Sequence, residues 1–135
     1  MKNRLEYSLN QFVNALDRLT EGAAVARDEL DRDGVIQRFE FCFELMWKTL
    51  KVYLEDSGIE ARSPKDSLKA AFGQGWITEE DGFLDMLADR NKTSHIYSRE
   101  ESLRVYDRIT KQHIPLIKAL AERLRALGVG PMKSE

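Results

Sequence analysis

The spacing of apolar residues along the chain predicts long amphipathic helices. In the first segment the apolar residues recur every three or four positions, which places them on one stripe of a helix that ends before Arg27. These residues are Leu5, Leu9, Phe12, Leu16 and Leu19. No stretch of useful length alternates apolar and polar residues with a period of two, so no β-sheet is expected.

The second predicted helix, closed by Gly58, carries the broadest apolar face. Its apolar residues are Val35, Ile36, Phe39, Phe43, Met46, Trp47, Leu50 and Leu54, with Phe41, Leu45 and Val52 widening the face. A helix in a monomeric up-and-down bundle needs only one apolar stripe, so this surplus indicates burial on two sides. A homodimer interface or a partner's groove would explain it.

Capping signals mark the starts of three further helices. Residues 63–66 (Ser-Pro-Lys-Asp) predict a short helix stopped by the glycines at 73–75, residues 78–81 (Thr-Glu-Glu-Asp) cap a fourth helix, and residues 98–101 (Ser-Arg-Glu-Glu) form a capping box for the last. The inner face of the fourth helix is predicted to carry Phe83, Leu84, Leu87 and Asn91.

The last helix is predicted to be long and to end at Gly128, leaving residues 129–135 as a flexible tail. Pro115 lies within it and predicts a kink, because proline lacks the backbone N–H and crowds the preceding turn. The expected fold is therefore all-α: an antiparallel up-and-down bundle of four to five helices, homodimeric, with one domain over residues 1–128.

Composition narrows the possible functions. With 135 residues, 42% hydrophobic and 33% charged, the chain has enough apolar residues for one core. The net charge of -2 argues against coating nucleic acid through bulk charge, so a polyanion would have to bind a local patch. Neither a signal peptide nor a membrane span is evident, and we expect a cytoplasmic protein.

Cysteine and histidine usage gives no sign of a metal or cofactor. Cys42 is the single cysteine, so neither a disulfide nor a cysteine-based zinc site can form within one chain, and we expect it to be a small buried packing residue. The two histidines, His95 and His113, are far apart in sequence and show no ligand spacing with carboxylates. His113 is expected to pack in the core.

The segment from Arg90 to Tyr97 brings an arginine, a histidine and a tyrosine into eight residues. In an unbroken helix Arg90 and His95 would point about 140° apart. Because a new helix starts at Ser98, the preceding one must break between Thr93 and Tyr97, which would let His95 swing toward Arg90. Arginine offers a fixed fork of donors to a phosphate, and histidine titrates near neutral pH, so the pair suits phosphodiester cleavage without metal.

A structural interpretation of the same residues stays open. An arginine at a helix C-terminus interacts favourably with the dipole, a histidine in a turn often caps a carbonyl, and the following tyrosine often packs its ring. In the second helix Glu40, Glu44 and Lys48 form a polar seam with four-residue spacing. Such seams are usually solvated; the functional alternative is that Glu40 and Arg38 border the cleft of a dimer.

The pattern Arg-x4-His-x-Tyr formed by Arg90, His95 and Tyr97, with Asn91 beside the arginine, resembles the signature of the HEPN superfamily, in the branch of nucleotidyltransferase substrate-binding proteins or HepT toxins. The likeness covers roughly residues 3 to 127. It extends to Arg38-Phe39-Glu40-Phe41 with Glu44, Trp47 and Lys48, to Ser63-Pro64, and to Gly75-Trp76-Ile77. Ile96 replaces the threonine most often expected between the histidine and the tyrosine.

The resemblance implies a homodimer whose paired Arg90 and His95 line a shared cleft that cuts RNA without metal. Asn91, Glu40 and Arg38 would be accessory residues. The implied partner is a minimal nucleotidyltransferase antitoxin that attaches AMP to Tyr97. Two alternatives remain: a non-catalytic subunit that presents a nucleotide or other substrate to the nucleotidyltransferase, and a scaffold in which Arg90 and His95 can be replaced without consequence.

Overall fold

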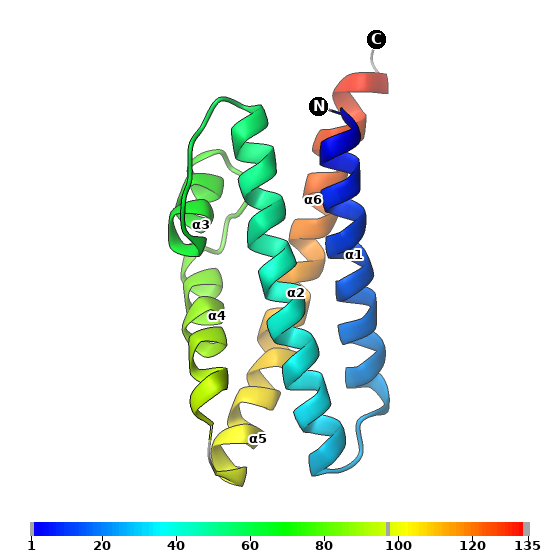
Figure 1. The fold of residues 1–135 in the computed structure, drawn as a ribbon, viewed down its shortest axis with the longest axis vertical. Helices are drawn as coiled ribbons and strands as arrows, with labels where there is room; N and C mark the ends of the chain where they lie inside the picture. The colour runs from blue at the N-terminus through cyan, green and yellow to red at the C-terminus, as the bar shows by residue number, and fades with distance from the viewer. Residues whose placement is uncertain (1, 97, 134–135) are drawn as a thin grey trace.

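The computed structural model describes residues 2–96 and 98–133, and these form an all-helical up-and-down bundle (Figure 1). Helix α1 (Lys2–Val25) runs antiparallel to α2 (Glu29–Asp56), and the short helices α3 (Pro64–Gly73) and α4 (Glu80–Lys92) lie on the far side of α2 from α1. A 3₁₀ turn, η1 (Thr93–His95), follows α4. The chain then returns through α5 (Arg99–Arg108), a π-helical turn η2 (Ile109–His113) and α6 (Ile114–Lys133).

One continuous core holds these helices together, and α2 lies at its centre. The predicted stripe of α1 and the inner face of α2 are confirmed, as is the burial of Cys42. The largest side chains that are fully buried are Phe12, Leu19, Phe39, Phe43, Met46, Leu50, Leu54, Leu68, Ile77, Phe83, Met86 and Ile109. Phe41, which was predicted to widen the face of α2, stays 59% exposed in the single chain.

Most predicted helix boundaries are confirmed by the capping contacts. The Ser63 hydroxyl accepts a hydrogen bond from the Asp66 amide at 3.1 Å with Pro64 in the first turn, and Gly58 and Gly75 adopt φ of 81° where α2 and α3 terminate. The start of α4 differs from the prediction: Glu79 occupies the N-cap position and makes no side-chain capping bond, so Thr78 lies one residue too early to cap.

The inner face of α4 was predicted only in part. Phe83 is buried, and Leu84 and Leu87 are partly buried against the core, as predicted, but Asn91 is exposed. The structure also buries Met86 and Asp89, which the prediction did not include. Apolar periodicity cannot identify Asp89 as an inward residue, because a carboxylate is buried only where partners compensate its charge.

The last helix also departs from the prediction at two points. Near Pro115 it widens into the π turn η2, in which the Ile114 amide bonds to the Ile109 carbonyl five residues earlier, instead of simply kinking. Helical backbone then continues through Lys133, past Gly128, where we expected the helix to end. No helix among residues 2–96 and 98–133 combines the length and apolar character needed to cross a membrane.

Candidate functional site

The helix break predicted within the Arg90 to Tyr97 segment is confirmed. Helix α4 ends at Lys92, η1 carries the backbone to His95, and Ile96 is extended with φ of -92° and ψ of 112°. Ser98 then caps α5, accepting a hydrogen bond from the Glu101 amide at 3.1 Å. The two ends of this segment are therefore fixed by regular helices, and His95 lies on the turn between them.

Arg90 is held in place by α2 and yet remains open to solvent. Its Nη2 donates to Oε1 of Glu44 at 2.9 Å and its Nη1 donates to Oδ1 of Asn91 at 3.4 Å. The side chain is still 37% exposed. A guanidinium has five N–H donors, so donors remain for an anion arriving from solvent.

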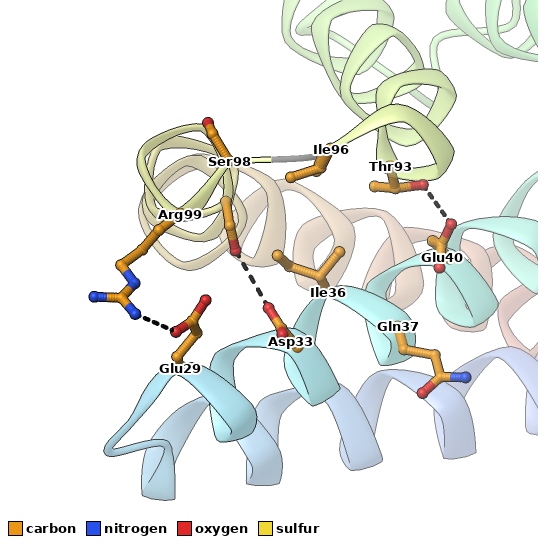
Figure 2. A pocket seen from close by; sticks show the side chains of 10 residues that line it. Glu29, Asp33, Ile36, Gln37, Glu40, Thr93, Ile96, Ser98 and Arg99 are labelled. Carbon is orange, nitrogen blue, oxygen red and sulfur yellow. Dashed lines mark hydrogen bonds and ion pairs between the residues drawn. The ribbon is translucent and has the colours of Figure 1, made fainter.

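Glu40 anchors the turn that follows Arg90. Its carboxylate accepts a hydrogen bond from the Thr93 hydroxyl, whose oxygen also lies 2.7 Å from the Arg90 carbonyl oxygen at the end of α4 (Figure 2). Glu40 and Thr93 also border a groove of about 430 Å³ between α2 and the start of α5. The other residues lining it are Glu29, Asp33, Ile36, Gln37, Ile96, Ser98, Arg99 and Ser102.

His95 is exposed on η1, and no hydrogen bond or ion pair links it to Arg90 or to any other residue that the structure describes. A 3₁₀ turn advances about 120° per residue, against 100° in an α-helix, so η1 does not by itself rotate His95 toward Arg90. The structure therefore places Arg90 in contact with Asn91 and Glu44 and gives no hydrogen bond or ion pair between His95 and Arg90. Tyr97 lies outside the described residues.

Arg38 lies on the other side of α2. Its Nη1 donates to the Arg18 carbonyl oxygen of α1 at 2.6 Å. Residues two apart on a helix point about 200° apart, so Glu40 faces α4 while Arg38 faces α1. Within one chain the structure brings Glu40, but not Arg38, to the neighbourhood of Arg90.

A buried ionic network next to Arg90 was missed by the sequence analysis. Asp89, only 4% exposed, accepts two hydrogen bonds of 2.8 Å from Nε and Nη2 of Arg108 and lies 2.7 Å from Nε2 of His113, whose side chain is fully buried. Burial alone would raise the pKa of the Asp89 carboxyl, but the hydrogen bonds and charges of His113 and Arg108 hold that pKa well below its usual range. The carboxylate raises the pKa of Arg108 in turn.

The π turn explains how Arg108 and His113 reach the same carboxylate. Residues five apart diverge by about 140° on an α-helix, whereas i to i+5 bonding brings them nearly above one another. The His113 ring also stacks on Phe39 at a centroid distance of 5.5 Å, which confirms its predicted place in the core. Asp89 is thus fixed to the last helix, while its neighbour Arg90 is fixed to α2.

Comparison with known proteins agrees with this architecture. Residues 5–126 match the family described as nucleotidyltransferase substrate binding protein like. A crystal structure of a Thermus thermophilus protein superposes with a TM-score of 0.78 at 34% identity, covering 84% of this chain and 98% of that one. A Haemophilus influenzae structure, described as the fold of a substrate binding domain of a nucleotidyltransferase, gives a TM-score of 0.64 at 25% identity and covers 93% and 99%.

A curated relative carries a more specific name. The chain is 36% identical over 81 residues to the probable ribonuclease HepT of Haemophilus influenzae, an alignment that spans 56% of each protein. The match thus covers only about half the length of that relative. The family match over most of the chain, the shared helical fold and this relative lead to one conclusion: the chain belongs to the nucleotidyltransferase substrate binding protein like family, the HepT-type branch of the HEPN superfamily.

Proposed function

We propose that the protein is an endoribonuclease toxin that cuts RNA without a metal and is silenced by AMPylation of Tyr97 by a partner nucleotidyltransferase. The observation that supports this best is the half-exposed Arg90 guanidinium, fixed by Glu44 at the end of α4 and followed by the exposed His95 on a turn. The name of the Haemophilus influenzae relative, probable ribonuclease HepT, supports the same chemistry.

The proposed reaction is an in-line attack of a ribose 2′-hydroxyl on the adjacent phosphate. A bond forms between the 2′-oxygen and phosphorus, and the bond to the 5′-oxygen of the next nucleotide breaks, leaving a 2′,3′-cyclic phosphate and a 5′-hydroxyl. His95 would take the proton from the 2′-hydroxyl or supply one to the leaving oxygen, while Arg90 offsets the charge that builds on the phosphoryl oxygens. Asn91, bonded to Arg90, would orient the guanidinium or the strand.

The proposed homodimer is supported by apolar side chains that the single chain leaves exposed. Phe41 and Leu30, both on α2, lie open to solvent. Burying such residues against a second copy would remove apolar area from water. In this arrangement the Arg90 and His95 motifs of two protomers would line one cleft, which would supply an arginine and a histidine from different chains to one phosphate.

The chain neighbours of Tyr97 support silencing by the partner. Ile96 and Ser98, on either side of the tyrosine, both line the groove between α2 and α5. An AMP attached to Tyr97 would add negative charge and bulk two residues along the chain from His95. The modification would therefore repel and obstruct the substrate.

Co-expression with the nucleotidyltransferase tests this proposal. Expressed alone, the wild-type protein is expected to arrest growth. With the partner present, growth should recover, and the intact mass should rise by one or more AMP units. Tyr97→Phe should show no mass increment and should stay toxic in the presence of the partner. An unmodified wild-type protein from co-expressing cells, or increments that persist in Tyr97→Phe, would contradict the assigned regulation.

A non-catalytic substrate-binding subunit is the second candidate. The family description and the Haemophilus influenzae structure, described as a substrate binding domain of a nucleotidyltransferase, favour it. The pairing of Arg90 with Glu44 is compatible with both functions, since either would use the guanidinium to bind a phosphate. Only the ribonuclease requires His95 and predicts toxicity, so the growth assay separates the two.

A further inference from the structure

The polar seam of α2 faces the end of α4 and changes sign along its length. Glu40 bonds to Thr93, Glu44 bonds to Arg90, and Lys48 follows one helical turn later, about 6 Å further along the axis. From spacing alone this seam could be an ordinary solvated stripe or the border of a cleft. In the structure it is the surface against which the proposed catalytic arginine is fixed.

A single carboxylate joins the two cations of the seam. Oε1 of Glu44 accepts from Nη2 of Arg90 at 2.9 Å, and Oε2 of the same group lies 3.4 Å from Nζ of Lys48. Glu44 can neutralise only one of the two positive charges, so the three side chains of Arg90, Glu44 and Lys48 together carry one net positive charge. Because Lys48 is 57% exposed and Arg90 is 37% exposed, both cations are open to an anion from solvent.

The charges on the side of Glu40 that is away from Lys48 set a direction for a bound RNA strand. Among the described residues that line the groove between α2 and α5, three carry a carboxylate, Glu29, Asp33 and Glu40, and one carries a positive charge, Arg99 (Figure 2). This excess of negative charge disfavours phosphates there. A polyanion held at Arg90 is therefore repelled from the Glu40 side and attracted toward Lys48.

From this arrangement we propose that Lys48 is a further RNA-binding residue, contacting the phosphate next to the one that Arg90 holds. The inference rests on the proposed ribonuclease function and adds the path of the RNA backbone along α2. Glu44 keeps the two cations at adjacent places in the absence of RNA. When RNA binds, its phosphates pair with Arg90 and Lys48, either alongside the Glu44 carboxylate or in its place.

The salt dependence of binding distinguishes this role from that of an ordinary surface ion pair. The probe is a fluorescent single-stranded 2′-O-methyl RNA, which cannot be cut because it lacks the attacking hydroxyl, and anisotropy is measured over a series of KCl concentrations. Each phosphate contact on a single strand contributes about 0.7 to the slope of log Kobs against log salt. Lys48→Gln is expected to lower the slope by about 0.7 and to weaken binding at low salt, and Lys48→Arg should keep the wild-type slope.

Lys69 supplies the matched control. It also forms an exposed lysine–glutamate pair, 3.5 Å from Glu80, but at the far end of α4 from Arg90. Lys69→Gln is expected to bind as the wild type does. A wild-type slope and affinity for Lys48→Gln, or an equal loss for Lys69→Gln, would overturn the inference while leaving the proposed function standing. Absence of RNA binding by the wild-type protein would overturn both.

Discussion

His95→Ala is expected to slow RNA cleavage by about 10²- to 10⁴-fold, the usual contribution of a positioned general acid or base. The loss should appear in kcat rather than in KM, because His95 is proposed to move a proton in the transition state and not to hold the strand. It should not reflect unfolding, since His95 is exposed and hydrogen-bonded to no other residue that the structure describes. The measurement is the cleavage rate of one defined RNA at saturating concentration.

The melting temperature supplies the control for this variant. Substitution of an exposed side chain that has no specific partner usually changes the free energy of unfolding by less than about 0.5 kcal/mol. The melting temperature of His95→Ala should therefore equal that of the wild type. An unchanged cleavage rate would remove the histidine from the mechanism. It would also leave the substrate-binding subunit as the better account of the family resemblance.

Asp89→Ala is expected to lower the free energy of unfolding by about 3–5 kcal/mol, the typical cost of removing one partner of a buried ion pair. The variant would leave His113 buried without its carboxylate, in a position where its Nδ1 already has no hydrogen-bond partner among the described residues. It would also release the Arg108 side chain, which otherwise holds the end of α4 against the last helix. Urea unfolding at neutral pH measures the change, and Asp85→Ala, on an exposed position of the same helix, is the matched control.

Asp89 should also make the stability of the fold depend on pH in the acid range. Because folding lowers the pKa of Asp89, its contribution to stability is complete above the unfolded value of about 3.9 and is lost as the pH falls below it. The difference in unfolding free energy between wild type and Asp89→Ala should therefore shrink below about pH 4. A difference that stays constant down to about pH 2 would contradict the assigned ionic partnership.

The helices and their caps could be predicted because they depend on local patterns. The apolar stripe from Leu5 to Leu19, the Ser63 and Ser98 caps and the break before Ser98 all follow from residues within a few positions of one another. The inward position of Asp89 could not be predicted in this way. It depends on Arg108 and His113, which meet the carboxylate only through tertiary packing and the π turn.

Part of the candidate site could also be predicted from the sequence, and part could not. Arg90 and the turn bearing His95 followed from the motif and its spacing. The partner of Arg90 did not, because Glu44 belongs to a helix 46 positions away and was part of a seam expected to be solvated. Arg38 and Glu40, which were expected to border one cleft, face different helices because residues two positions apart on an α-helix point in nearly opposite directions.

The most direct test of the proposed function is the treatment of RNA and of its 2′-O-methyl counterpart with wild-type protein in EDTA. The proposed mechanism predicts that only the RNA is cut, and that the products carry 2′,3′-cyclic phosphate and 5′-hydroxyl ends. Cleavage of both strands would show that the 2′-hydroxyl is not the nucleophile. Intact RNA under conditions in which the unmodified protein is folded would contradict the ribonuclease assignment itself.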